Sequence, residues 1–290
     1  MKNWTIVATF FGLWISTMFE AAVQQVLAYA LILTVGVLHG ANDITLIRFS
    51  AKKSNVSFSF SSVLIYYMLT VLIVLVVFFI YPPLALITFV LISGYHFGEQ
   101  HFKKYVTANR FLVSGLFLFY GLTILFMIFY FKMNKVVPIL AEVMGVVLPV
   151  SFFAYGLMTV GCTAVMAMLW LTYKKQLKTN LLEELFYIVV LLVVFNTADL
   201  LWGFCIYFIL WHSIPSLMDQ VHVLYGSASK RGFIKYLQSS WVYWSFSIVG
   251  LVLLFLIFKN NTDFFVSVLI YFLAAITFPH VIVMSKIENT

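Results

Sequence analysis

Residues 62–81 read SVLIYYMLTVLIVLVVFFIY, twenty consecutive positions without a charged side chain. At 1.5 Å per residue, an apolar helix of this length covers the hydrocarbon core of a bilayer, roughly 30 Å. Comparable runs recur at about 4–19, 22–46, 83–101, 111–131, 151–173, 183–198, 200–219, 241–258 and 264–285. The sequence therefore predicts an all-α fold, a polytopic transmembrane helical bundle of about ten spans that forms a single integral-membrane domain over residues 1–290.

The composition supports a membrane protein and excludes an ordinary soluble domain. The chain is 63% hydrophobic and 9% charged, with a mean hydropathy of +1.05, whereas soluble domains carry about 25% charged residues. The net charge of +7 does not indicate nucleic-acid binding, because the basic residues form small groups between apolar runs, as in cytoplasmic loops. Cys162 and Cys205 lie inside apolar runs, so we expect buried thiols and no disulfide.

The basic residues predict an orientation with both termini in the cytoplasm. In that arrangement 14 of the 17 lysines and arginines lie on the cytoplasmic side, and Lys132, Lys135 and Lys259 lie outside, a strong positive-inside asymmetry. The stretch from Val136 to Val150 is short for a span, and we expect it to be interfacial or re-entrant. The cytoplasmic loops hold Arg48, Lys52 and Lys53; Lys103, Lys104 and Arg110; Lys174, Lys175 and Lys178; and Lys230, Arg231 and Lys235.

Four of the six histidines occupy equivalent places in the predicted bundle. His39, His96, His212 and His280 lie in the second, fourth, eighth and tenth spans, each in the cytoplasmic half. An ionisable side chain inside a membrane is costly and indicates a functional site. Imidazole is a ligand for iron, zinc and copper. If the even-numbered helices are neighbours, we expect these four rings to converge on one metal ion.

Two carboxylates are placed to support the histidines. Asp43 is four residues after His39 and Glu99 is three residues after His96, so in continuous helices each pair shares a face. A carboxylate there holds a ring N–H and fixes the tautomer of a ligating histidine. The alternative is that these polar groups satisfy one another at the membrane interface. We expect His101, at a loop edge, to be solvated.

The remaining sequence features narrow the functional classes. The clustered histidines of two-iron desaturases, the phosphate-binding G-x-x-x-x-G-K-[ST] loop and the deep intramembrane lysine of a retinal-binding opsin do not occur. An alternative to a metal-dependent enzyme is a transporter or proton-coupled channel with a histidine relay. A haem protein with paired axial histidines is a third interpretation.

The ordered motifs His39-Gly40-x-x-Asp43, His96-Phe97-Gly98 and Trp211-His212-Ser213 resemble the Brp/Blh family of bacterial membrane enzymes. The resemblance implies cleavage of β-carotene at its central 15,15′ double bond, giving two molecules of all-trans-retinal, with O₂ and Fe(2+). It also implies a multi-pass protein of the bacterial inner membrane, with iron bound by the histidines of these three motifs, and a functional link to a retinal-binding opsin.

The chain departs from the family pattern at two positions. Ser216 stands where the family often has a second histidine, four residues after that of the Trp-His-Ser motif, and serine is a poor iron ligand. We expect His280 to be the fourth ligand, with His222 as the second choice. His101 stands where the family often has Asp, three residues after the glycine of His-Phe-Gly. Asp43 and Glu99 remain the expected supporting carboxylates.

Overall fold

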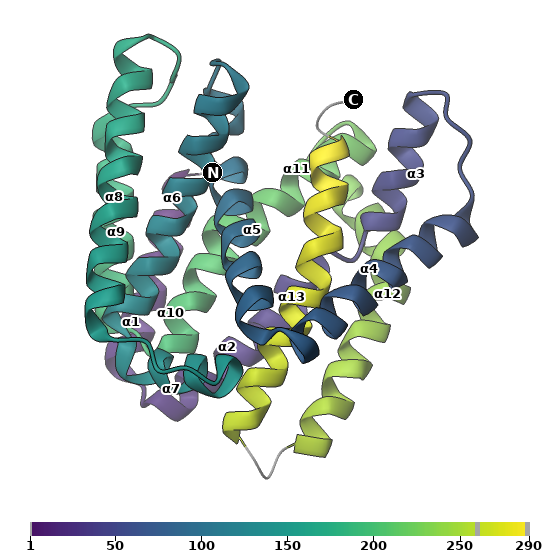
Figure 1. The fold of residues 1–290 in the computed structure, drawn as a ribbon. Coiled ribbons are helices and arrows are strands. Elements are labelled where there is room, and N and C mark those ends of the chain that lie inside the picture. Colours follow the sequence, from purple (N-terminus) through teal and green to yellow (C-terminus); the bar gives the residue numbers. More distant parts are fainter. Residues whose placement is uncertain (1, 259–261, 288–290) are drawn as a thin grey trace. The chain divides into compact units, whose positions relative to one another are not determined.

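The computed structural model describes residues 2–258 and 262–287 (Figure 1). Every regular element in these ranges is a helix, which confirms the predicted all-α class. In the first half they are α1 (Lys2–Met18), α2 (Ala21–Leu31), η1 (Ile32–Gly36), α3 (Asp43–Lys53), α4 (Phe60–Ile80), α5 (Pro82–Phe102), η2 (Lys103–Tyr105) and α6 (Arg110–Phe131). The second half forms α7 (Met133–Met144), α8 (Val150–Tyr173), α9 (Leu181–Thr197), α10 (Leu200–Ile206), η3 (Tyr207–Ser213), α11 (Ile214–Tyr225), α12 (Lys230–Phe258) and α13 (Thr262–Ile287).

Six helical segments of the described chain are long and apolar enough to cross a membrane. They are Phe60–Ile80, Arg110–Phe131, Val150–Tyr173, Leu200–Tyr225, Lys230–Ile257 and Ser267–Lys286. Each overlaps one of the predicted runs. The helices α1 and α9 have 17 residues each and α2 with η1 forms a shorter apolar helix, so the full count of ten spans stays a prediction.

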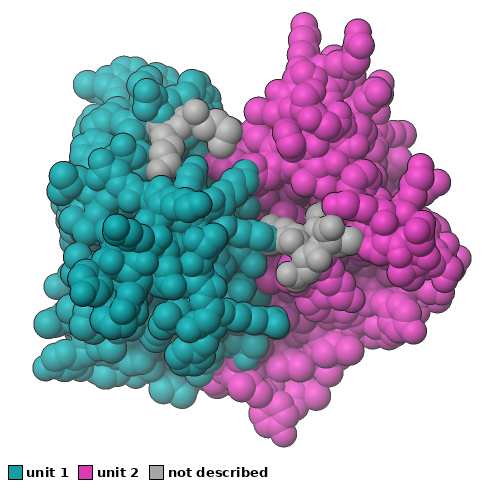
Figure 2. Space-filling view, turned by 90° about the horizontal axis from the view of Figure 1, so that it is seen from above, with its two compact units in different colours: residues 1–29, 87–212 teal, residues 30–86, 213–290 magenta. Residues whose placement is uncertain are grey.

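The chain divides into two compact units, coloured teal and magenta in Figure 2. Unit 1 comprises residues 1–29 and 87–212, and unit 2 comprises residues 30–86 and 213–290. Both units are built from separate stretches of sequence. The single integral-membrane domain over residues 1–290 stays a prediction.

In unit 1, the predicted cytoplasmic loops gather at one end. Lys178 N–H donates to Tyr105 C=O (2.7 Å) and Thr107 N–H to Gln176 C=O (2.8 Å), which joins the basic loops that follow α5 and α8. An isolated β-bridge between Val106 and Leu177 completes this contact. The two loops therefore lie on the same side of any membrane that the unit crosses.

The predicted external loops of unit 1 are joined in the same way. Lys132 Nζ donates to Asn196 C=O (2.9 Å), Lys135 pairs with Asp199, and Asp199 N–H donates to Gln24 Oε1 (3.0 Å). The 22-residue α6 connects this group to the basic loops, a rise of about 33 Å. This geometry agrees with the alternation of loops read from the sequence. The third predicted external residue, Lys259, lies outside the described residues.

The predicted second span, 22–46, is not one helix. After α2 the backbone widens into the π-helical η1, forms turns over residues 39–42 and restarts as α3 at Asp43. The turns are held by i→i+3 bonds such as Gly40 N–H to Val37 C=O (3.3 Å). The continuous-helix prediction is wrong here, because side chains from α11 and α12 supply partners for the backbone carbonyls that the break frees.

Several basic residues assigned to loops lie in helices. Lys230, Arg231 and Lys235 fall in the first turns of α12, which begins eleven residues before the predicted span, and Lys52 and Lys53 end α3. The interfacial stretch after Val136 is largely the 12-residue α7, too short to cross a bilayer. The helix buries Val136, Leu140 and Val143 on one face.

In unit 2, α13 packs against α3 and α4, and α11 packs against α12. One buried cluster joins Leu46 to Val283 and Met284, and a second joins Leu217, Val221 and Tyr236. These clusters bring the turn after His39 to a fixed place among α11, α12 and α13.

Candidate functional site

Unit 2 brings together two of the predicted histidines, His39 and His280. Their ring centroids are 4.9 Å apart and their planes meet at 85°, and both side chains are buried. His39 lies where the chain leaves the helical run after η1, and His280 follows Pro279 inside α13. Because 240 intervening residues separate the two positions, this pairing is a product of the tertiary fold.

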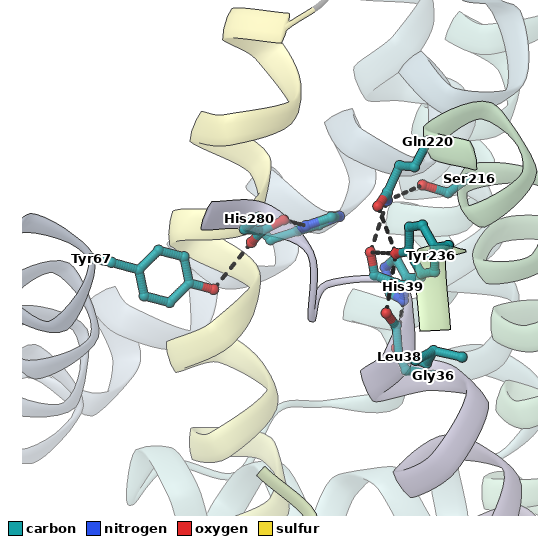
Figure 3. Close-up of polar contacts among 9 residues, drawn as sticks. Gly36, Leu38, His39, Tyr67, Ser216, Gln220, Tyr236 and His280 are labelled. Carbon is teal, nitrogen blue, oxygen red and sulfur yellow. Dashed lines mark hydrogen bonds and ion pairs between the residues drawn. The ribbon is translucent and has the colours of Figure 1, made fainter. Parts of the chain in front are cut away.

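Asp43 supports His280, not the histidine that shares its motif. His280 Nδ1–H donates to Asp43 Oδ1 at 2.8 Å, and Tyr67 O–H donates to the other oxygen, Oδ2, at 3.1 Å (Figure 3). The turns at residues 39–42 break the helix in which Asp43 would share a face with His39. The prediction of an i,i+4 contact was therefore wrong, although the role of Asp43 as a supporting carboxylate is compatible with its new partner.

The backbone at His39 is held by residues that sequence reasoning missed. Gln220 Nε2 donates to His39 C=O (2.8 Å), and Tyr236 O–H lies 2.8 Å from Gln220 Oε1 and 3.3 Å from the same carbonyl (Figure 3). Asn42 Nδ2 donates to Tyr236 C=O (3.1 Å). We call Asn42, Gln220 and Tyr236 the His39 clamp. The sequence signal that could have pointed to the clamp is Gln220, a polar residue directly after the apolar run 200–219.

Ser216 belongs to the surroundings of this clamp. It is fully buried, and its hydroxyl lies 3.4 Å from Gln220 Nε2. Pro215 occupies the first turn of α11, directly after the π-helical η3. The position that often carries histidine in the resembled family thus helps to place the amide that contacts His39.

Unit 1 brings together the other two predicted histidines, His96 and His212. Their ring centroids are 4.9 Å apart with an interplanar angle of 75°, and both side chains are buried. Phe97 and Phe208 border the His212 ring, with centroids 4.7 and 5.7 Å away. His96 comes from α5, whereas His212 lies in the π-helical η3; single π-turns inside helices are frequent at functional sites.

Glu99 lies beside His96 as the i,i+3 spacing predicts. Its Oε2 is 3.9 Å from His96 Nδ1, and the carboxylate is buried. The glycines that flank His96 serve helix packing: a Cβ at Gly98 would overlap the backbone carbonyl of Phe117, and one at Gly94 would lie 2.9 Å from Leu122. Small residues permit such close approach of α5 to α6, which fixes where His96 sits.

The two remaining histidines differ in their surroundings. The expectation that His101 is solvated was wrong: its ring lies at the end of α5, stacked on Tyr120 (centroids 4.9 Å apart), and Nε2 is 2.6 Å from the fully buried Glu184 Oε2. His222, the second choice for a fourth ligand, is exposed on α11.

The chemistry of the paired imidazoles suits a soft-to-borderline divalent metal. His39 Nδ1 contacts the Gly36 carbonyl oxygen, which only accepts, and His280 Nδ1 contacts a carboxylate. Each Nδ1 therefore carries a hydrogen, and in the neutral form of the ring this leaves the lone pair on Nε2 for a metal. Among the described residues, no group of three or more His, Cys, Asp or Glu side chains is arranged to hold a metal ion. Convergence of all four rings on one ion stays a prediction.

Comparison with known proteins identifies the family. The family model of the β-carotene 15,15′-dioxygenases matches residues 30–288, which contain all four paired histidines. The chain matches no curated protein and no solved structure. Since the match covers most of the 290 residues, the chain belongs to the β-carotene 15,15′-dioxygenase family.

Proposed function

We propose that this protein cleaves the central 15,15′ double bond of β-carotene to give two molecules of all-trans-retinal. The observation that carries the proposal is the family match over residues 30–288 together with the two buried histidine pairs inside it. In the dioxygenase balance the C=C bond and the O=O bond break and two C=O bonds form. The four electrons that reduce O₂ come from the cleaved carbons, so no further reductant is required.

We propose Fe(2+) as the cofactor, bound by imidazoles of His39, His96, His212 and His280. Imidazole suits iron, and bound iron would supply the O₂ chemistry that amino-acid side chains lack. The protein's contribution is placement: Asp43 fixes the tautomer and orientation of His280, the His39 clamp holds the backbone of His39, and Glu99 stands beside His96. Phe97 and Phe208 provide apolar surroundings for His212.

The proposed location is the bacterial inner membrane, with multiple spans and both termini in the cytoplasm. The six long apolar helices and the 14 to 3 distribution of basic residues support it. β-Carotene is itself a bilayer solute, so an enzyme embedded in lipid can take it directly from the membrane. Retinal released there would be available to a retinal-binding opsin, the functional partner that we propose.

The test uses bacterial cells engineered to accumulate β-carotene. The unmodified chain should convert carotene to retinal, measured by chromatography of extracted pigments. His39→Ala and His96→Ala should abolish conversion, whereas the control His222→Ala, at an exposed histidine, should retain it. Unchanged carotene with the unmodified protein present in the membrane and iron supplied would overturn the proposal. In that case, pH-dependent flux in liposomes would favour the transporter or channel alternative.

A further inference from the structure

The N-terminal helix α1 has two contrasting faces. Thr5, Thr9 and Gly12, spaced four and three residues apart, are buried, and Ser16 continues this side. The large side chains of α1 point elsewhere: Trp4, Val7, Phe10, Phe11 and Trp14 are all exposed. Helices in lipid pack through small and hydroxyl-bearing residues and leave bulky apolar ones to the acyl chains. The pattern is that of a membrane helix packed against its own protein.

The buried face of α1 packs against α9 and α10 within unit 1. A Cβ at Gly12 would lie 3.0 Å from the Ile206 side chain, so the glycine sets a close approach. Trp202 Nε1–H donates to Gly12 C=O at 3.0 Å. The last residue of α10 and a tryptophan of its first turn are thus both held by α1.

A second tryptophan extends this contact into the π-helical segment. Trp211 Nε1–H donates to Thr9 Oγ1 at 3.0 Å, and the same hydroxyl donates to Thr5 C=O at 2.7 Å. Thr9 is fully buried, and its bond to Thr5 C=O fixes the direction of its hydroxyl hydrogen, which leaves the oxygen lone pairs free to accept from Trp211. Trp211 immediately precedes His212 in η3.

We infer that α1 is a positioning element for His212, acting through Thr9 and Trp211. A π-helical turn has i→i+5 bonds in place of the i→i+4 ladder, and the Trp211 indole adds a contact from this segment to α1. The indoles of Trp202, in α10, and Trp211, in η3, both donate to residues of α1, so one helix contacts the chain before and within the π-helical segment. Residues 2–18 of α1 precede the region 30–288 that the family model matches.

The test compares four full-length proteins in detergent: wild type, Thr9→Val, Thr9→Ser and Phe10→Leu. Valine keeps the shape of threonine but removes the acceptor for Trp211, whereas serine retains it. Phe10 is 53% exposed on the opposite side of α1 and serves as the control. The catalytic readout rests on the proposed function. We expect Thr9→Val to lower kcat by about tenfold with KM little changed, since small displacements of a catalytic group cost this much or more.

Thr9→Ser and Phe10→Leu should behave as wild type. Equal kcat values for Thr9→Val and wild type, or an equal loss in Thr9→Ser, would overturn the inference while leaving the proposed function intact. Hydrogen exchange of the amides of residues 207–212 gives a readout independent of turnover. Faster exchange in Thr9→Val alone supports the inference, and unchanged exchange overturns it, even if the wild type forms no retinal and the proposed function fails.

Discussion

Removal of the Asp43 carboxylate should weaken iron binding through His280. The side chain is buried and receives two hydrogen bonds, from His280 Nδ1–H (2.8 Å) and Tyr67 O–H (3.1 Å). A hydrogen bond to a charged group contributes about 1.5–3 kcal/mol, and each factor of ten in affinity corresponds to about 1.4 kcal/mol. For Asp43→Ala we therefore expect iron affinity to fall about 10- to 100-fold, the range found for partners of metal-binding histidines.

Two milder variants should lower iron affinity by less than Asp43→Ala does. Asp43→Asn keeps one oxygen that can accept from His280 but loses the charge, so its loss should be smaller. Tyr67→Phe removes a donor to the same carboxylate but leaves the bond between Asp43 and His280 in place, so only part of the effect should reach the metal, and affinity should fall about fivefold, or about 1 kcal/mol. Iron titration of the purified proteins, followed by metal analysis, measures all three. Glu142→Gln, an exposed carboxylate on α7, is the control. A folded Asp43→Ala protein with wild-type affinity would refute the positioning role.

Three further changes test the packing that holds the histidines. Gly98→Ala should lower the free energy of unfolding by about 1–3 kcal/mol through overpacking against α6, whereas Gly115→Ala, with open space around it, should not; thermal melts in detergent compare them. Tyr236→Phe leaves buried acceptors of the His39 clamp unsatisfied, so we expect the free energy of unfolding to fall by about 1–3 kcal/mol. Denaturant titrations measure this loss, and equal midpoints for the variant and the wild type would contradict the stabilising role of the clamp. Glu184→Ala removes the buried carboxylate that contacts His101 Nε2 at 2.6 Å and should cost about 1–3 kcal/mol; an unchanged melting temperature would contradict that contact.

The helices could be predicted because lipid offers the backbone no hydrogen-bond partners. An apolar run such as 62–81 must satisfy its own peptide groups, and α4 indeed covers Phe60–Ile80. The same rule explains the failure at 22–46. A hydrophobic run does not reveal that Gln220 and Tyr236, nearly 200 residues away, donate to backbone carbonyls at residues 38 and 39 and so permit a break.

The residues of the candidate site could be predicted from the sequence, but the contacts between them could not. Four histidines at corresponding positions in apolar runs stood out because ionisable groups are costly there. The sequence assigned Asp43 to His39 by helical spacing, and the turns that separate them give it to His280 instead. Glu99 does lie beside His96, as their i,i+3 spacing predicts, because α5 is continuous through both residues.

The iron dependence of carotene cleavage by the purified protein tests the proposed function most directly. The protein would be stripped of metal with a chelator, mixed with β-carotene in detergent under air and titrated with Fe(2+). We expect no retinal without iron and a rate that rises with bound iron, with no recovery in His39→Ala or His96→Ala. Full retinal formation by the stripped protein, or no retinal from protein loaded with iron, would contradict the proposed function.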